Sequence, residues 1–358
     1  MELRIDKIPN VLGYRFICFA DLHLDDYGEN INIEPSKFDD RINVLIKIMS
    51  YAITNQIGDV YCLGDLFHSR TKIGIDVISK FSNLLDIFVS DFPDVRLIAI
   101  KGNHDSHFKD SSFSSILAFK YKNFIPITEI TYFKNKKIVA VPFENVPTGL
   151  LDEKSEYLFL MHTEFVGASN NGYEVLKSKI FPEMFGGSVV LSGHYHKYQI
   201  LGNRRNVMYV GTPLQHNFGE SGNNTYFWDC LLDYENKILY AEPILLNTAP
   251  KYIVITFEEL NNISFEQLEG NFVRVLTKKQ NYVDATTKVK DIMGKIPVRT
   301  LEVSVLEENI ENITMISNIK EEKNIDVVEE YLKIMKVENF EEYYTIAQEI
   351  LDEAKRGI

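Results

Sequence analysis

Five short polar motifs occur in the first 200 residues of this chain, and each follows or ends an apolar run. They are Asp21-Leu22-His23, Gly64-Asp65, Gly102-Asn103-His104-Asp105, the single residue His162, and Gly193-His194-Tyr195-His196. Apolar runs of this length predict buried strands, and polar residues just after such strands gather at one edge of a sheet. The series therefore predicts a fold whose strand ends bring carboxylates, an amide and imidazoles together.

The rest of the N-terminal two thirds alternates between strand-like and helix-like segments, which predicts an α/β core with helices packed on strands. Strands are expected at residues 15–20, 60–63, 95–101, 138–141, 157–161 and 189–192, and amphipathic helices at 38–53 and 75–89. The polar motifs lie at the C-terminal ends of these expected strands, where ligand-binding residues of an α/β sheet gather.

The character of the chain changes at Pro250. Strands expected at 252–257, 272–276 and 300–305, with a helix at 285–293, predict a small α+β domain. We therefore expect four regions: an α/β core over 1–248, a small α+β domain over 249–306, a linker over 307–324, and two amphipathic C-terminal helices over 325–358.

Composition narrows the setting of the protein. No apolar run reaches the roughly 18 residues of a membrane span, and the N-terminus has no signal-peptide pattern. Cys18, Cys62 and Cys230 are widely spaced, which favours reduced thiols over a disulfide framework. We expect a cytoplasmic protein that does not contact a membrane.

The net charge of −13 argues against binding to nucleic acid, but its distribution weakens that argument. Residues 301–358 hold 15 acidic and 6 basic side chains, a net of −9, so the first 300 residues hold only −4. Two divalent ions would offset that remainder. The acidic C-terminal region favours a protein partner.

The motifs have the composition of a two-metal phosphoesterase. Such a site holds two ions roughly 3.5–4 Å apart, and a carboxylate that bridges them is expected at Asp65. Carboxylate, amide and imidazole ligands together suit divalent ions such as Mn²⁺ or Fe²⁺. We expect Asp21, His23 and His196 to complete one site, and Asn103, His162 and His194 to complete the other.

Hydrolysis also requires a proton for the departing sugar oxygen. A water between two cations loses its proton readily and becomes the nucleophile. His104 follows the ligand Asn103 without being a ligand itself, so we expect it to act as general acid or transition-state stabiliser. Asp105 is expected to orient the His104 imidazole and raise its pKa.

The ordered motifs resemble the calcineurin-like metallophosphoesterases. Gly64-Asp65-Leu66-Phe67-His68 resembles the second motif of the SbcD-type nucleases within that superfamily. Residues 209–215 and Phe218-Gly219-Glu220 resemble the loop that follows the family's last histidine motif. The resemblance covers residues 14–245. It implies a β-sandwich flanked by helices as the nuclease core over 1–248, followed by a small capping and DNA-binding domain over 249–306 and C-terminal helices.

The resemblance also implies an activity and partners. These are a Mn²⁺-dependent 3′–5′ exonuclease on duplex DNA, an endonuclease on single strands, a homodimer, and an SbcC-type coiled-coil ATPase that docks on the C-terminal helices. Such a protein would process DNA ends in recombination and repair, in a bacterial cell or a phage-infected host. By motif match, His68 would contact substrate phosphate and His104 would be the catalytic histidine.

Two other functions stay open. A protein Ser/Thr phosphatase or cyclic-nucleotide phosphodiesterase would share the metal ligands, but the acidic residue and Arg that phosphatases place after the second-motif Asp are replaced by Leu66-Phe67-His68. A non-catalytic scaffold that binds DNA ends is the other, and the complete ligand series argues against it.

Several further residues have weaker interpretations. His107 and His216 fit no ligand position, although the loop that holds His216 could approach DNA. Apolar residues of the second helix are expected to contribute to a dimer contact: Ile75, Ile78, Phe81 and Leu85. Five basic residues are either solvated or bound to DNA phosphates: Lys134, Lys136, Lys137, Arg204 and Arg205.

Overall fold

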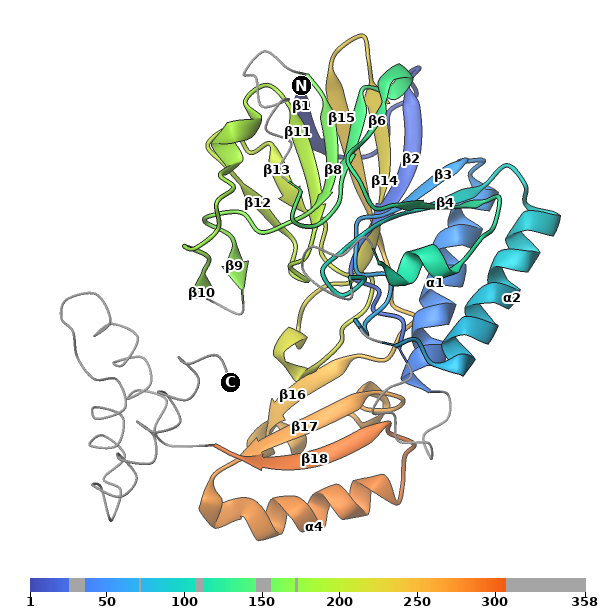
Figure 1. The fold of residues 1–358 in the computed structure, drawn as a ribbon. Coiled ribbons are helices and arrows are strands. Elements are labelled where there is room, and N and C mark those ends of the chain that lie inside the picture. Colours follow the sequence, from blue (N-terminus) through green and yellow to red (C-terminus); the bar gives the residue numbers. More distant parts are fainter. Residues whose placement is uncertain (26–35, 71, 107–112, 146–155, 171–172, 307–358) are drawn as a thin grey trace, which may run out of the picture.

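The computed structural model describes residues 1–25, 36–70, 72–106, 113–145, 156–170 and 173–306. Within them the chain forms a two-sheet sandwich with helices on one outer face, followed by a small unit at one end (Figure 1). The expected linker, the two C-terminal helices and His107 lie outside the described residues. The α/β sandwich flanked by helices is the predicted fold class.

The first sheet has seven strands in the order β1-β15-β14-β2-β3-β4-β5. Its strands are β1 Glu2–Ile5, β2 Tyr14–Phe19, β3 Asp59–Cys62, β4 Arg96–Ile100, β5 Phe124–Ile127, β14 Tyr226–Asp233 and β15 Ile238–Leu245. Strands β2 to β5 run parallel to one another, so their C-terminal ends share one edge of the sheet.

The second sheet has six strands in the order β12-β13-β11-β8-β7-β6. They are β6 Thr131–Phe133, β7 Ile138–Val141, β8 Leu158–His162, β11 Val189–Gly193, β12 Gln199–Leu201 and β13 Val207–Tyr209. β7, β8, β11 and β13 are parallel. A short hairpin, β9 Ser169–Asn170 and β10 Tyr173–Glu174, lies beside this sheet.

Alternation of side chains along the central strands explains the layers, because successive residues of a strand face opposite sides of a sheet. Phe16 and Cys18 of β2 pack between the two sheets, whereas Ile17 and Phe19 pack under the helices. All four are fully buried. Both faces of the first sheet are therefore covered, and its strands read as continuous apolar runs.

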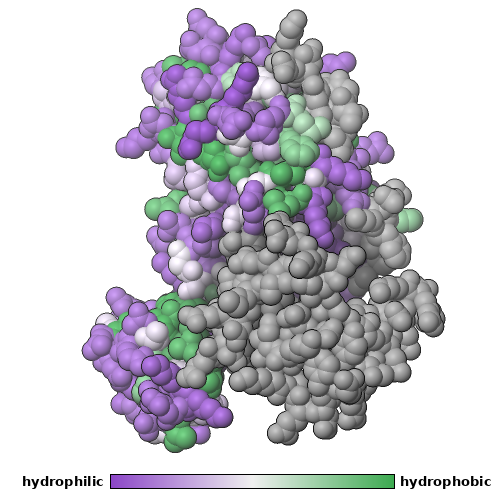
Figure 2. All heavy atoms as spheres, turned by 90° about the vertical axis from the view of Figure 1, so that its left-hand side faces the viewer, coloured by the Kyte–Doolittle hydropathy of each residue, from purple (hydrophilic) through white to green (hydrophobic). Residues whose placement is uncertain are grey.

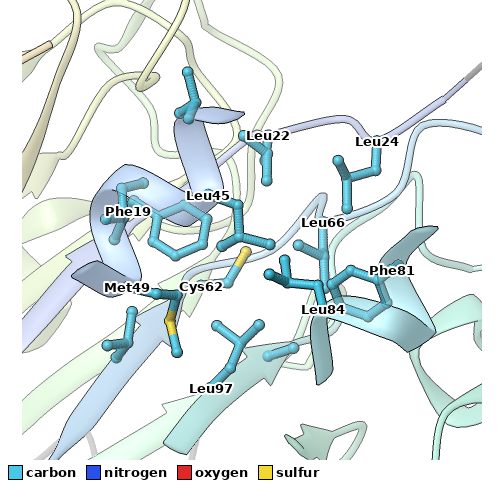
Figure 3. Close-up of a cluster of buried hydrophobic side chains, with 14 of the residues drawn as sticks. Phe19, Leu22, Leu24, Leu45, Met49, Cys62, Leu66, Phe81, Leu84 and Leu97 are labelled. Carbon is cyan, nitrogen blue, oxygen red and sulfur yellow. The ribbon is translucent and has the colours of Figure 1, made fainter. Parts of the chain in front are cut away.

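Two helices cover the outer face of the first sheet. They are α1 Lys37–Thr54, which begins with a reciprocal hydrogen-bonded cap between Ser36 and Asp39, and α2 Ile75–Asp91. Figure 3 shows Leu45 and Met49 of α1 and Phe81 of α2 meeting strand residues such as Phe19 and Cys62. The loops that follow β2 and β3 lead to α1 and α2, so these packed helices anchor the far end of each loop.

The position of α2 corrects part of the expected dimer contact. Phe81 and Leu85 are buried in the core, at 0% and 1% exposure, so the prediction that they contribute to a dimer surface is wrong. Ile75 and Ile78 are exposed, at 84% and 42%. A helical apolar stripe shows which residues can be buried, but its edges stay at the surface.

The small unit contains a three-stranded parallel sheet. Its strands are β16 Tyr252–Thr256, β17 Phe272–Thr277 and β18 Thr300–Val305; α3 Phe257–Leu260 follows β16, and α4 Tyr282–Met293 connects β17 to β18. These positions lie within a few residues of those expected from the sequence. Figure 2 shows the unit as a separate lobe with a mostly hydrophilic visible surface.

Strand β1 was not expected, because its four residues include the charged Glu2 and Arg4 and only Ile5 and Leu3 are apolar. It pairs in parallel with β15 and forms the edge of the first sheet. Among the described residues, no helix combines the length and apolarity needed to cross a bilayer.

Candidate metal centre

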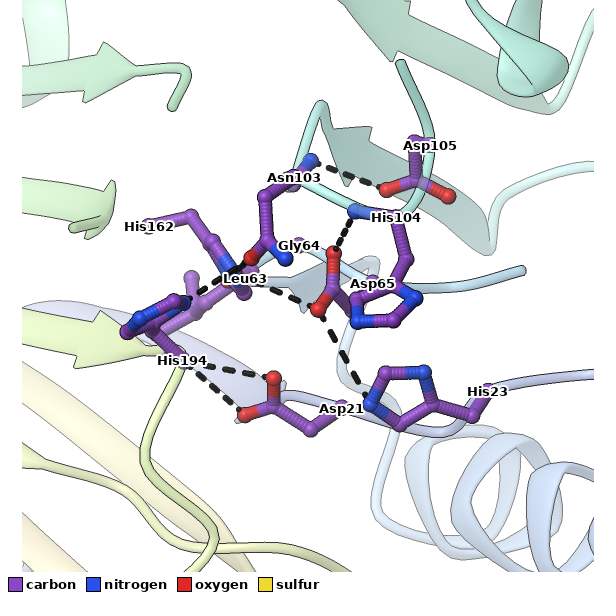
Figure 4. Close-up of polar contacts among 12 residues, drawn as sticks. Asp21, His23, Leu63, Gly64, Asp65, Asn103, His104, Asp105, His162 and His194 are labelled. Carbon is purple, nitrogen blue, oxygen red and sulfur yellow. Dashed lines mark hydrogen bonds and ion pairs between the residues drawn. The ribbon is translucent and has the colours of Figure 1, made fainter. Parts of the chain in front are cut away.

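The motif residues meet at one edge of the sandwich. Strands β2, β3 and β4 of the first sheet and β8 and β11 of the second all point their C-terminal ends to this edge. The structure brings all seven expected ligands together there. Figure 4 shows Asp21, His23, Asp65, Asn103, His162 and His194, and the seventh, His196, lies beside His23.

The donor atoms fall into two groups. In the first, His23 Nε2 lies 3.2 Å from His196 Nε2, and Asp21 offers a carboxylate oxygen within 4.8 Å of both. In the second, Asn103 Oδ1 lies 2.9 Å from His162 Nε2 and 2.9 Å from His194 Nδ1. Asp21 and Asp65 each also offer an oxygen within 4.8 Å of a nitrogen of His162, so the division of the ligands between two ions stays a prediction.

Asp65 lies between the two groups. Its Oδ2 is 3.8 Å from His23 Nε2 in the first group and 3.5 Å from His162 Nε2 in the second. Its Oδ1 accepts a hydrogen bond of 2.8 Å from the backbone N–H of His104. One carboxylate oxygen is therefore fixed by the backbone, and the other is free to face two ions.

The donor set fits divalent metal. Two nitrogens bound to one ion at about 2.1 Å lie about 3–3.4 Å apart, so the His23–His196 separation suits a shared ion. Hard and borderline divalent ions accept this mixture of carboxylate, amide and imidazole ligands. Two ions, one on each side of Asp65, would give every donor atom a metal to bind. The assignment of each ligand to an ion stays a prediction.

Backbone strain accompanies the ligands. Asp21, His23, Asp65 and His194 have φ values of 56°, 52°, 52° and 103°, in the left-handed region that non-glycine residues seldom adopt. Such conformations are held only where the surrounding structure determines them, which is common at functional sites. The strand ends and their packed loops provide that support here.

Two glycines of the motifs are required by close packing. A Cβ at Gly64, whose φ is 98°, would collide with the His162 ring, and a Cβ at Gly102 would collide with the Asp65 carboxylate. The Gly-Asp and Gly-Asn pairs in the sequence thus have a steric cause: the glycine lets the next loop approach the ligands.

Three ligands are also held through their second ring nitrogen. His162 Nδ1 donates to the Leu63 carbonyl at 2.8 Å, His196 Nδ1 donates to Glu220 at 2.7 Å, and His194 Nε2 lies 3.1 Å from Glu164 Oε1. Such contacts fix the tautomer and the ring orientation of a ligand. Glu164 and Glu220 were not identified as site residues from the sequence, because neither lies in a metal-ligand motif.

Charges within the cluster shift several pKa values in the chain without metal. Burial disfavours the charged forms, but the opposite charges of Asp65 and His162 outweigh it. They lower the pKa of Asp65 to about 2 and raise that of His162 to about 9. Burial, together with the charge of His162, lowers the pKa of His194 to about 3.

His68 and His104 stand side by side next to the first group, with stacked rings whose centroids are 4.9 Å apart. His104 Nδ1 donates to the His68 carbonyl at 2.8 Å, which leaves its Nε2 for a reacting group. His68 Nδ1 lies 3.1 Å from His23 Nδ1. If His23 binds an ion through Nε2, its proton is on Nδ1. The Nδ1–H of His23 then donates a hydrogen bond to His68 Nδ1, and the proton of His68 is on Nε2.

Asp105 has a different position from the expected one. Its buried carboxylate accepts hydrogen bonds from the backbone N–H groups of Phe67 at 3.0 Å and Gly102 at 2.9 Å. Burial and the charge of Asp65 raise its pKa to about 7. The prediction that Asp105 orients the His104 imidazole is wrong: it ties the β3 and β4 loops together, and the His68 carbonyl orients the ring.

His216 also differs from its interpretation, because it lies against the site. Its ring centroid is 5.0 Å from that of His23, and its Nε2 donates to the Asp21 carbonyl at 2.8 Å. With Arg41, His68 and His104, it lines a cavity of about 290 Å³ over the donor groups. The sequence placed His216 in the loop after the last histidine motif, without a ligand role, and its packing against His23 was not predicted.

The five basic residues considered for DNA contact do not line this cavity. Lys134, Lys136 and Lys137 precede β7, and Arg204 and Arg205 precede β13, so they lie at the opposite ends of strands parallel to β8 and β11. Lys136 pairs with Asp59 at 2.5 Å. Any contact these residues make with nucleic acid is remote from the donor groups.

Comparison with known proteins identifies the family. Residues 14–198, just over half of the chain, match the calcineurin-like phosphoesterases. The chain belongs to this family. The matched range contains every expected ligand together with His68 and His104.

The relatives of this calcineurin-like phosphoesterase include viral proteins. The "Uncharacterized protein R555" of Acanthamoeba polyphaga mimivirus is 22% identical over 294 residues, which cover 70% of this chain and 21% of that protein. The "Putative phosphoesterase 244L" of Invertebrate iridescent virus 6 is 26% identical over 188 residues, 48% of this chain and 64% of that protein. The chain spans less than two thirds of the length of each.

Among solved structures, the chain is similar to the Pseudomonas putida nuclease MPE at 13% identity and a TM-score of 0.29, over 60% of this chain and 83% of that one. A TM-score this low adds no argument about substrate. The family membership rests on the match over residues 14–198.

Metal binding should release protons. Asp65 raises the pKa of His162 to about 9, so in the metal-free chain His162 is protonated near pH 7 and must lose that proton to bind an ion. We expect the apparent Mn²⁺ affinity to rise up to about tenfold per pH unit from pH 7 toward pH 8.5. Calorimetry in PIPES and in Tris would measure the release, and His162→Ala should reduce it. Heats that do not depend on the buffer would contradict the assignment.

Proposed function

We propose that this calcineurin-like phosphoesterase is a Mn²⁺-dependent DNA nuclease that processes DNA ends, with exonuclease activity on duplexes and endonuclease activity on single strands. The observation that carries the proposal is the pair His68 and His104 beside the donor groups, with one imidazole fixed as a hydrogen-bond donor and the other able to transfer a proton.

The division of work follows from these contacts. When bound, the two ions supply an activated water and offset phosphate charge. The Nε2–H of His68 would donate to a non-bridging phosphate oxygen. His104, held through Nδ1 by the His68 carbonyl, would use Nε2 to protonate the departing sugar oxygen. Arg41, which lines the same cavity, adds positive charge where the phosphate would lie.

The surface beside the cavity supports a polymeric substrate. A groove of about 750 Å³ shares His194, His196 and Asn217 with the cavity over the donor groups. A cyclic nucleotide would leave this groove empty, whereas a strand with nucleotides on both sides of the scissile phosphate could occupy both hollows. The position after Asp65 also holds Leu66, Phe67 and His68 rather than an acidic residue and arginine.

The decisive assay is degradation of end-labelled duplex DNA with Mn²⁺. His104→Ala should lower kcat about 10²- to 10⁴-fold, the usual effect of losing a general acid, while the bound metal remains. His68→Ala should weaken DNA cleavage even at Mn²⁺ concentrations that saturate both metal sites, because the phosphate loses a hydrogen-bond donor. Leu12→Ala, at a 97% exposed position before β2, is the control. Hydrolysis of phosphopeptides or cyclic nucleotides without DNA cleavage would refute the nuclease, and DNA binding without any hydrolysis would indicate a scaffold.

We also propose that residues 325–358 bind an SbcC-type coiled-coil ATPase through their two amphipathic helices, which the sequence alone predicts. Deletion of 325–358 should abolish association with the ATPase, because the apolar faces are removed. Mn²⁺-dependent cleavage of bis-(p-nitrophenyl) phosphate should persist. Co-elution of the truncated chain with the ATPase in gel filtration would contradict the proposal.

A homodimer through α2 is the remaining part of the proposal. Ile75 and Ile78 are exposed on one side of the helix, and charges there would oppose burial of the surface between two copies. Ile75→Asp combined with Ile78→Asp should halve the mass measured by light scattering. Leu12→Asp, at a 97% exposed position before β2, is the control. A double variant that stays dimeric would exclude this surface.

A further inference from the structure

We propose that the small unit of residues 252–305 is a structural component of one metal site: it holds the turn Asn217–Ser221, and Glu220 of that turn positions His196 for its ion. The inference rests on the proposed two-metal function. It assigns Glu220 as a positioning residue and assigns the small unit a role in metal binding.

Glu220 is held on both carboxylate oxygens. Oε1 accepts from His196 Nδ1 at 2.7 Å and from Asn217 Nδ2 at 3.0 Å, and Oε2 accepts from the backbone N–H of His216 at 2.8 Å. The side chain is only 7% exposed. With three donors on two oxygens, its rotamer is fixed. Because the Nδ1–H of His196 donates to Glu220, the lone pair of the imidazole is on Nε2, the atom that faces His23.

The small unit contacts this turn directly. The backbone N–H of Val254 in β16 donates to Ser221 Oγ at 3.0 Å, next to Glu220 in the chain. Phe218 lies against the Tyr252 ring of β16, with centroids 5.0 Å apart, and the Arg274 guanidinium of β17 lies 4.1 Å from its centre. The start and the end of the turn are therefore both held by the parallel sheet of the small unit.

Two further contacts fix the small unit to the core. The backbone N–H of Tyr252 donates to Gln215 Oε1 at 2.7 Å, just before the turn. Arg299 pairs with Asp40 of α1 at 2.8 Å, and the two side chains are only 9% and 10% exposed. A buried pair of this kind is costly to break from one side, since the remaining charge loses its partner. The sheet is thus a fixed support for the turn.

The second donor group is supported differently. His162 is held by the Leu63 carbonyl and His194 by Glu164, and both partners belong to the sandwich. Loss of support from the small unit should therefore affect the ion at Asp21, His23 and His196 and leave the other ion in place. A Glu220 that merely stabilised the fold would affect both ions alike.

Calorimetric titration of the full-length protein with MnCl₂ tests this asymmetry. Wild type should bind two ions. Glu220→Ala should weaken one of them about 10- to 100-fold, the usual effect of removing a residue that orients a ligand, and leave the other unchanged. Glu220→Gln keeps an oxygen for His196 and should restore part of the affinity. Combined with His196→Ala, the Glu220→Ala change should add no further loss, because its effect passes through that imidazole.

Phe218→Ala tests whether the small unit supports the turn. It removes the contacts with Tyr252 and Arg274 and should weaken the same ion by a smaller factor. Tyr282→Ala, a 43% exposed aromatic on α4 away from the turn, should not change either ion. Thermal melts in EDTA check that each variant folds. Equal weakening of both ions, or wild-type affinity in Glu220→Ala, overturns the proposal. A wild type that binds two ions but cleaves no DNA would instead contradict only the proposed nuclease.

Discussion

The site depends on the contacts made by the buried carboxylate of Asp65. A carboxylate removed from water costs several kcal/mol unless charges and hydrogen bonds replace the lost solvation. Here the His104 N–H fixes one oxygen, and His162 and His23 approach the other. Gly102 is required beside it because any side chain would collide with the carboxylate. The ends of β3, β4 and β8 are thus determined by the space around one side chain.

That arrangement explains why so much could be predicted from the sequence. Asp65, Asn103 and His194 each lie a few residues after an apolar run. The strands that carry them are parallel within each sheet, so the position in the sequence indicates the edge where they meet. The strands and helices of the core and the small unit follow from apolar periodicity in the same way. Strand β1 does not, because its stability comes from pairing with β15 rather than from its own apolar pattern.

The residues that were missed or misassigned share a physical cause. Asp105 follows His104 in the chain, yet its carboxylate turns to two backbone N–H groups, and no sequence pattern fixes that rotamer. Glu220 lies 24 residues after His196, and the loop between them folds back to bring the two into contact. Phe81 and Ile78 lie on one apolar stripe of α2, but only packing decides which is buried. Contacts set by side-chain direction or long loops need the three-dimensional structure.

The histidines of the site are also coupled through their protons. A neutral imidazole has one N–H, so the use of one nitrogen decides what the other can do. The Nδ1–H of His196 donates to Glu220, and the Nδ1–H of His23 donates to His68. Binding of an ion by His23 would therefore set the tautomer of His68, a ring that is not an expected ligand. His104 does not belong to this series of hydrogen-bonded imidazoles, because its Nδ1–H donates to a backbone carbonyl. Its Nε2 can therefore take part in proton transfer without changing which nitrogen of a ligand imidazole carries the proton, as a general acid beside two metal ions requires.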